Sequence, residues 1–192
     1  HGLAIDAVLQ LSTALAVIVY FRSELVRLMA RAFEWVSRKP IPGEDARLLA
    51  ALLAGTIPAV IIGLLLESTM ETLFRSASLV AYALIAGSAI MLVAELFSKR
   101  VLAPTSVPAL NATKGFLIGL FQALALVPGM SRSGMTISGG LFLGLSREAA
   151  ARFGFLLSVP IIVGSGLKKL IELEAGGALS DIGVALLVGS AS

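Results

Sequence analysis

Long apolar runs separated by short polar segments organise most of this chain. Four runs are long enough to cross a membrane as helices, because a hydrocarbon core needs about 20 helical residues. They are Leu3–Phe21, Leu48–Leu66, Leu79–Ala94 and Ala149–Leu167. Residues 22–47 mix apolar and basic positions at roughly helical spacing, which predicts an amphipathic helix at the membrane interface.

The pattern changes between Lys114 and Arg147. The 32 intervening residues carry a single charge, Arg132, within a break rich in Pro, Gly and Ser. The apolar pieces on either side, Gly115–Val127 and Met135–Leu145, have 13 and 11 residues, too few for either to span a bilayer. This pattern predicts a re-entrant helical hairpin over residues 115–145, whose tip is buried in protein or lines a wet cavity.

Basic residues predict the orientation of these segments. Residues 22–47 contain six Lys or Arg and residues 67–77 contain one, which places the former in the cytoplasm and the latter outside. The hairpin then enters from the cytoplasmic side. Lys168 and Lys169 fall outside, which is mildly discordant with the rule.

Composition supports a membrane protein. Of 192 residues, 57% are apolar and 14% charged, against about 45–50% and 25% in soluble domains. The net charge of +3 is spread over short loops without interleaved aromatics, which argues against a nucleic-acid surface. Without cysteine, and with His1 as its one histidine, the chain shows no metal-ligand cluster. We expect an all-α, polytopic integral membrane protein with residues 1–192 in one membrane domain.

Arg132 is the strongest candidate functional residue. A charge at bilayer depth costs roughly 2.5–3.5 kcal/mol on insertion scales, so it is expected to serve a function, unless it snorkels to an interface or pairs with a carboxylate elsewhere. Asp6, near the start of its span, is expected at the outer interface, with a supporting contact to Arg132 as the alternative. Its neighbours favour an anion: they supply hydroxyl groups, bare backbone and a following helix N-terminus. These neighbours are Ser131, Ser133, Gly129, Gly134 and the helix expected to begin near Met135. Together they predict a phosphate-type site.

The segment Gly115–Gly140, with its Pro-Gly-Met-Ser-Arg-Ser-Gly core, resembles the signature region of bacterial undecaprenyl-diphosphate phosphatases, the bacitracin-resistance family. The resemblance extends through Val8–Arg22, Thr56–Ala59 and Phe153–Pro160, and so covers nearly the whole chain. It implies a multi-pass protein of the bacterial inner membrane that removes the terminal phosphate of a polyprenyl diphosphate, recycling the lipid carrier of cell-wall synthesis. It also implies an inverted-topology repeat, with two re-entrant hairpins meeting at a pocket that opens to the outer side.

The resemblance also implies roles for individual residues. Arg132 would clamp the diphosphate, with Ser131 and Ser133 as its catalytic partners. The remaining positions expected at the phosphate are Gly129, Gly134, Thr136 and Gln122. Interhelical hydrogen bonding is an equally good interpretation of Gln122.

One half of the family's site has no match in this chain. The resemblance implies a second hairpin with a Glu-x-x-x-Glu pair and a Ser-Ser-Thr-Gly-His loop, which would supply the acid or base and the nucleophile. We therefore expect an internal fragment, inactive alone, whose first hairpin precedes His1 and whose last spans follow Ser192. No cofactor is expected within it; Mg²⁺ or Ca²⁺ enters only through the family's carboxylates, and a homodimer is left open.

Two other classes of function fit the same residues. A membrane transporter or translocase of a lipid phosphate or another anion would also use broken helices and an anion-facing helix N-terminus. The second of these classes is a non-catalytic, lipid-binding interaction protein. Paired Glu, Ser or Thr, and His residues upstream of residue 1 would favour the enzyme.

Overall fold

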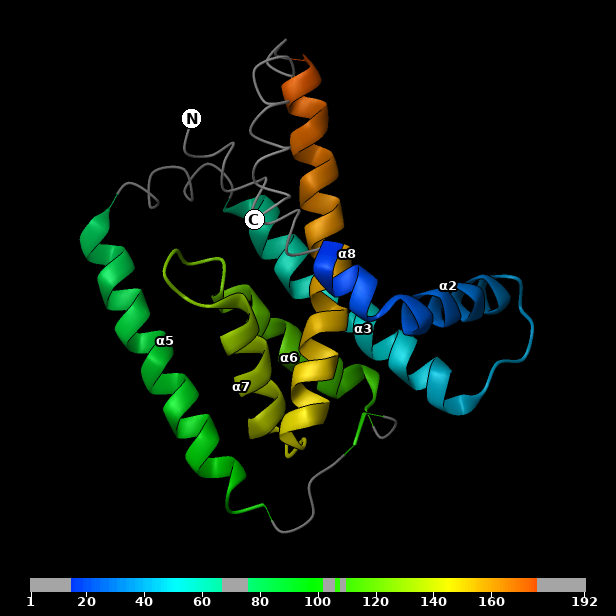
Figure 1. Ribbon diagram of the computed structural model, residues 1–192, viewed down its shortest axis with the longest axis horizontal. Helices are drawn as coiled ribbons and strands as arrows, with labels where there is room; N and C mark the ends of the chain where they lie inside the picture. Colours follow the sequence, from blue (N-terminus) through cyan, green and yellow to red (C-terminus); the bar gives the residue numbers. More distant parts are fainter. Residues whose placement is uncertain (1–14, 67–75, 102–105, 108–109, 176–192) are drawn as a thin grey trace. The chain divides into compact units, whose positions relative to one another are not determined.

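The computed structural model describes residues 15–66, 76–101, 106–107 and 110–175, with side chains as far as residue 164. The regular elements of these residues are helices (Figure 1). They are α2 (Arg22–Val36), α3 (Gly43–Leu65), α5 (Ala77–Ser98), α6 (Ala112–Leu124), α7 (Arg132–Phe142) and α8 (Arg147–Ala175), and residues 15–20 are helical as well. The chain divides into two compact units, and the one formed by Arg27–Leu157 contains the candidate site.

Two helices, α3 and α5, are long and apolar enough to cross a membrane among the residues that the structure describes. They confirm the second and third predicted spans as helices. Only 33% of the most apolar stretch of α3 and 17% of that of α5 is buried inside the protein. Many large apolar side chains of both helices are exposed, as expected where lipid covers them.

The other predicted spans are tested in part. Helix α8 covers the predicted run Ala149–Leu167 and continues to Ala175. The beginning of the first span, residues 3–14, and the apolar run from Ile182 lie outside the described residues. So does the polar connection at residues 67–75.

Polar caps fix where several of these helices begin. The side chains of Ser76, Asn111 and Ser131 accept hydrogen bonds from backbone N–H groups in the first turns of α5, α6 and α7. Ser146 does the same for α8, accepting from the backbone N of Ala149 at 3.1 Å. Such caps satisfy donors that a helix leaves open, each typically worth about 1 kcal/mol.

Small residues allow α3 and α6 to pack closely. A Cβ built on Gly115 would lie 2.2 Å from the backbone O of Ala51, and one built on Gly119 would lie 2.2 Å from the backbone O of Gly55. Because residue numbers rise together along both helices, α3 and α6 run parallel. Each helix thus contributes a pair of small residues four positions apart, the spacing typical of close helix contacts in membranes.

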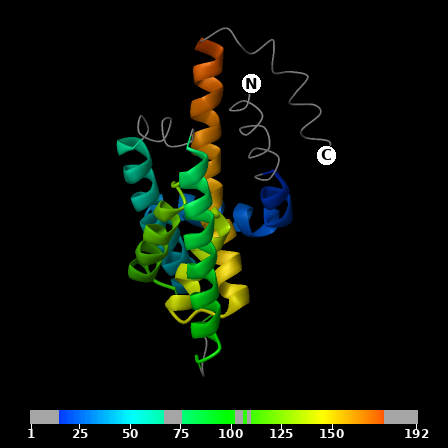
Figure 2. The same ribbon diagram turned by 90° about the vertical axis from the view of Figure 1, so that its left-hand side faces the viewer.

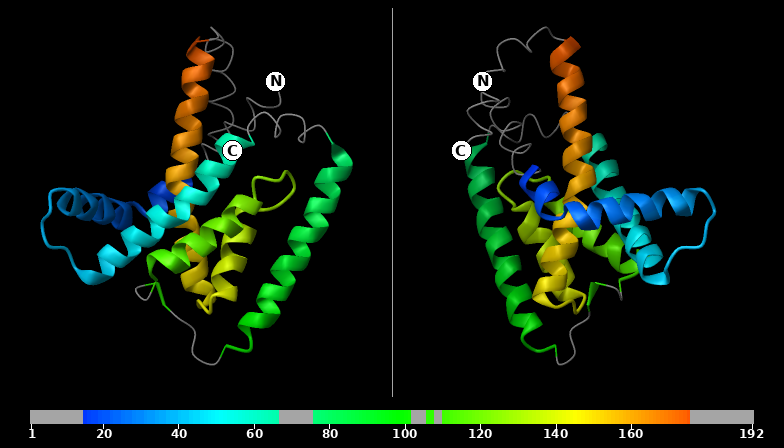
Figure 3. Two further views of the ribbon diagram at one scale, coloured as in Figure 1. Left: turned by 180° about the vertical axis from the view of Figure 1, so that it is seen from behind. Right: turned by 45° about the vertical axis from the view of Figure 1, so that its right-hand side comes forward.

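Helices α6 and α7 form a hairpin that packs beside α5. Phe121 of α6 lies against Gly139 and Phe142 of α7, and the rings of Phe142 and Phe97 are 5.8 Å apart. The views of Figures 1 and 2 both show α5 alongside the hairpin. Figure 3 shows the loop that joins α6 to α7 at the opposite end of the hairpin from the turn between α7 and α8.

Candidate functional site

The first turn of α7 is built around Ser131. Its Oγ accepts a hydrogen bond from the backbone N of Gly134 at 3.1 Å and lies 3.3 Å from the Oγ of Ser133. The capping bond occupies the Gly134 amide. The backbone N–H groups of Arg132 and Ser133 are therefore the helix-terminal donors best placed for an anion.

The loop before α7 lies against α5. Gly129 has a φ of 99°, and a Cβ added to it would lie 2.5 Å from the backbone O of Val80. Both observations require glycine at this position, because an L side chain would be strained and would collide with the α5 backbone. The bare side of Gly129 thus lies against α5, and contact between Gly129 and a phosphate stays a prediction.

Contacts along α5 give the depth of the site. Met130 lies beside Gly87, and the Sδ of Met91 lies beside Gly134, so Arg132 is level with the middle of α5. At 1.5 Å per residue α5 is about 33 Å long, and Gly87 lies about 15 Å from its start. If α5 crosses the bilayer, the first turn of α7, which carries Arg132, lies far from both ends of that helix.

Arg132 itself is half-buried. Ion pairs of the described residues include those of Arg27, Arg31 and Arg147, and Arg132 takes part in none of these. Asp6, considered above as its partner, lies outside the described residues. The structure thus shows a cation at the start of a helix with nearby hydroxyls and backbone donors, an arrangement that attracts anionic oxygen.

Thr136 is close to this turn but faces inward. It is 1% exposed, and its Oγ1 donates to the backbone oxygens of Arg132 at 3.0 Å and Ser133 at 3.1 Å. It also packs where a Cβ on Gly154 of α8 would be, 2.9 Å from that position. Its hydroxyl proton is thus engaged within α7, and contact between Thr136 and a phosphate stays a prediction.

Gln122 lies on a different surface from Arg132. It shares the face of α6 that includes Gly115 and Gly119, which pack against α3. The residue is 2% exposed, and neither its Oε1 nor its Nε2 has a hydrogen-bond partner among the described residues. The two interpretations of Gln122 from the sequence are a phosphate contact and an interhelical hydrogen bond. Both require a hydrogen-bond partner, since an unsatisfied buried amide costs about 1–3 kcal/mol.

The opposite end of the hairpin is fixed by an ion pair. Arg147, at the start of α8, donates from Nε to both carboxylate oxygens of Glu95 at 3.1 Å, and its Nη2 also bonds Oε1. The hydrogen bond and charge of Glu95 raise the pKa of Arg147 above its ordinary value. Between this pair and the contact of Gly129 with Val80, the hairpin follows about 22 Å of α5.

Sequence reasoning missed the walls of the site. Met91 and Gly87 of α5 lie against the first turn of α7, and the small-residue seam between α3 and α6 fixes the other arm of the hairpin. The seam had a readable signal, since Ala51 and Gly55 repeat the spacing of Gly115 and Gly119. The sequence carries no signal for the role of Met91, because that role depends on packing between distant segments.

No cluster of three or more His, Cys, Asp or Glu side chains that could hold a metal occurs in the part of the chain that the structure describes. A requirement for Mg²⁺ or Ca²⁺ stays a prediction.

The known proteins that are similar to this chain point to one family. A family model described as "Bacitracin resistance protein BacA" matches residues 1–192. A protein of Chloroherpeton thalassium named "Undecaprenyl-diphosphatase" is 38% identical over 197 residues, which covers 97% of this chain and 70% of that protein. Proteins of the same name from Myxococcus xanthus and Thermobifida fusca are 43% and 39% identical, covering 100% and 97% of this chain. The chain spans 65% and 63% of the length of these two relatives.

Proposed function

This chain belongs to the bacitracin resistance protein BacA family, and we propose that the protein hydrolyses undecaprenyl diphosphate to undecaprenyl phosphate and inorganic phosphate. The bond between the terminal phosphorus and the bridging oxygen breaks, and water supplies the oxygen of the new bond to phosphorus. Removal of that phosphate regenerates the lipid carrier used in cell-wall synthesis. The family and the names of its members support this substrate.

The position of Arg132 is the observation that most favours this reaction. A membrane-depth cation without a carboxylate partner among the described residues is expensive unless an anion neutralises it. The guanidinium fork can bind two oxygens of one phosphoryl group, while the N–H groups of Arg132 and Ser133 approach from the helix axis. The hydroxyls of Ser131 and Ser133 add hydrogen bonds beside them. Phosphoryl transfer depends mainly on positioning and charge stabilisation of this kind.

The membrane arrangement of α6 and α7 is part of the proposal. Their 13 and 11 residues correspond to about 20 Å and 17 Å of helix, short of a hydrocarbon core of about 30 Å. The start of α6 and the end of α7 lie at the same end of the hairpin, so the pair would enter and leave on one side as a re-entrant hairpin. The two helices correspond to the re-entrant hairpin that the sequence predicts over residues 115–145.

The orientation follows from the charges at that end. Basic residues gather near the start of α3, the end of α5 and the starts of α6 and α8. They are Arg47, Lys99, Arg100, Lys114, Arg147 and Arg152. By the positive-inside rule this end faces the cytoplasm, and the tip of the hairpin points toward the outer face of the inner membrane.

A nucleophile and a general acid or base complete the reaction. The hairpin at 115–145 offers hydroxyls and a cation but no carboxylate or histidine. We assign the missing groups to a second hairpin of opposite topology, the other half of an inverted repeat.

Phosphate release from undecaprenyl diphosphate by membranes containing the complete protein tests this function. Arg132→Lys keeps the charge and removes the bidentate fork, so we expect release to fall by about two to three orders of magnitude. Arg100→Lys, in the exposed turn after α5, is the matched control and should leave the rate unchanged. A near wild-type rate for Arg132→Lys would exclude the proposed site. Movement of a lipid phosphate across the bilayer without phosphate release would indicate a translocase.

A further inference from the structure

Helix α2 carries an exposed apolar stripe. Met29, Phe33 and Val36 are 70%, 72% and 82% exposed, and their spacing of four and three residues places them on one side of the helix. Three large apolar side chains in a row on a helix surface mark a contact with an apolar partner or with lipid.

The opposite side of α2 turns its charges toward α3. The Nε of Arg31 lies 3.3 Å from Oδ2 of Asp45, and Nη2 of Arg27 lies 3.9 Å from Oδ1 of the same carboxylate. Asp45 is only 7% exposed, and Leu28 on this side is buried. Two arginines of α2 thus bind a buried carboxylate of α3, while three large apolar side chains on the other side of α2 are left exposed, which is unusual for a helix facing water.

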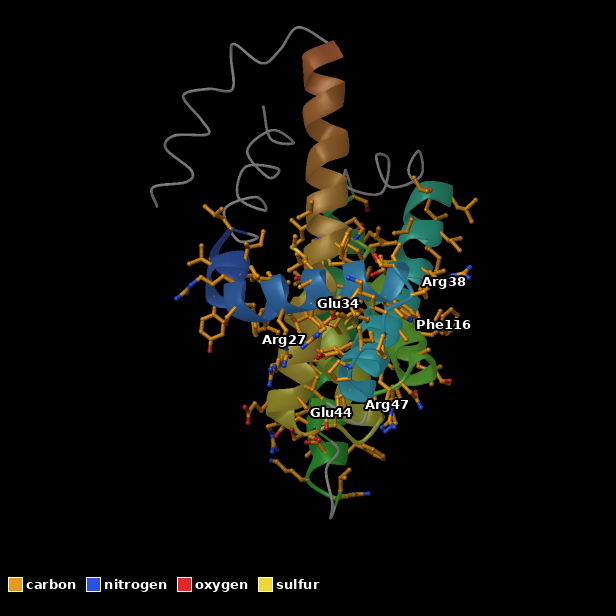
Figure 4. The ribbon with its side chains drawn as sticks, turned by 90° about the vertical axis from the view of Figure 1, so that its right-hand side faces the viewer. Arg27, Glu34, Arg38, Glu44, Arg47 and Phe116 are labelled. Carbon is orange, nitrogen blue, oxygen red and sulfur yellow. The ribbon has the colours of Figure 1, made fainter. Side chains whose placement is uncertain are left out.

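The surroundings of the stripe favour lipid as its environment. Helix α3, which Asp45 joins to α2, also exposes large apolar side chains further along its length, among them Leu53, Ile57 and Leu64. Where α2 ends and α3 begins, Arg38, Lys39 and Arg47 are exposed, and none of them pairs with a carboxylate among the described residues. Figure 4 shows Arg38 and Arg47 with Arg27, Glu34 and Glu44 on this side of the protein. An apolar stripe bordered by unpaired cations complements the acyl and phosphate layers of an anionic membrane surface.

The backbone at Arg38 provides an independent observation. Its φ is 58°, in the left-handed region where a helix commonly ends on glycine. The N–H of Lys39 bonds the backbone O of Glu34 at 2.9 Å, which closes the helix end around Arg38. A long basic side chain is thus held where glycine would be less strained, which indicates that the side chain itself has a use.

We propose that α2 lies along the lipid–water interface with Met29, Phe33 and Val36 among the acyl chains, and that Arg38, Lys39 and Arg47 bind the phosphates of anionic phospholipids. The contacts of Arg27 and Arg31 with Asp45 set the rotation of the helix. This surface is separate from the site at Arg132 and does not depend on the reaction proposed there.

The insertion of the stripe can be measured with single tryptophans, because Trp35 is the only one in the sequence. Trp35 lies two positions, or about 200° around the helix, from Phe33. The double variant Phe33→Trp with Trp35→Phe moves the reporter to the stripe. In vesicles, brominated lipids should quench this reporter several-fold more than Trp35, and aqueous iodide should quench it less. Strong iodide quenching would overturn the proposal. Resistance to both quenchers only at high protein-to-lipid ratios would also overturn the proposal, because a second copy of the protein would then cover the stripe.

The headgroup contact can be measured as the preference of the protein for spin-labelled phosphatidylglycerol over phosphatidylcholine. Arg38→Gly relieves the backbone but removes one charge, so the preference should fall by about fivefold, the factor for one basic residue at an anionic surface, without loss of thermal stability. Arg38→Lys keeps the charge and should retain the preference. An unchanged preference in Arg38→Gly would overturn the assignment of this residue.

Discussion

Ser131 caps α7 and is also proposed to contact the phosphate, and substitutions can separate the two roles. Ser131→Ala removes the cap on the Gly134 amide and should cost about 1 kcal/mol of stability. Ser131→Asp can still cap α7, but its carboxylate would compete with phosphate for Arg132. We expect this variant to keep its melting temperature and lose phosphate release. Ser131→Asn should also keep its melting temperature but lose less of the release, because it removes the hydroxyl without adding a negative charge. A fully active Ser131→Asp would show that no anion binds at this helix N-terminus.

At the scale of single residues, the sequence was informative where neighbours in the chain are neighbours in space. Ser131, Arg132, Ser133 and Gly134 were predicted as one cluster and lie within one turn of α7. The environment of Gln122 could not be predicted, because its burial depends on the contact of α6 with α3. The ion pair of Glu95 with Arg147 could not be predicted either, because it joins side chains 52 positions apart in the sequence.

Among the helices, the seam between α3 and α6 should be the contact most sensitive to added volume. A Cβ on Gly119 would lie 2.2 Å from the backbone O of Gly55, so Gly119→Ala must push two backbones apart. We expect a loss of about 1–3 kcal/mol, the usual cost of overpacking, measured as lowered resistance to denaturation in detergent.

Gly63→Ala is the matched control in the same pair of helices. A Cβ there would meet only Leu126 side-chain atoms at 3.9 Å, an ordinary contact. Alanine also favours helix over glycine by nearly 1 kcal/mol, so this variant should be as stable as the parent or slightly more stable. Equal losses for Gly119→Ala and Gly63→Ala would mean that the seam is not closely packed.

The apolar runs predicted which segments are helices. They predicted less well where each helix ends and which other helix it packs against. The runs at Leu48–Leu66 and Leu79–Ala94 became α3 and α5, which extend further because Glu44, Asp45 and Glu95 are also helical. A hydrophobic pattern stops at the first charge, whereas a helix accepts charges near its termini. The parallel pairing of α3 with α6 depends on distant backbone contacts that no run of residues encodes by itself.

For the whole molecule, the proposed orientation predicts that the ends of α5 face opposite sides of the membrane. The chain contains no cysteine, so single cysteines can be introduced at Ser78, near the start of α5, and at Lys99, just after its end. In intact cells an impermeant maleimide should label Ser78→Cys, while Lys99→Cys should react only after the membrane is permeabilised. The reverse pattern would place the tip of the hairpin on the cytoplasmic side.

The ion pair between Glu95 and Arg147 has a consequence for biogenesis. During synthesis α5 leaves the ribosome before the hairpin, and neither α6 nor α7 is long enough to be retained as a spanning segment on its own. Arg147 can reach the waiting carboxylate on α5 only when the start of α8 has emerged, so this contact forms after the whole hairpin has been synthesised. Helix α5 thus presents a contact to a segment that is made later, so the order of the helices along the chain limits the order in which their contacts can form.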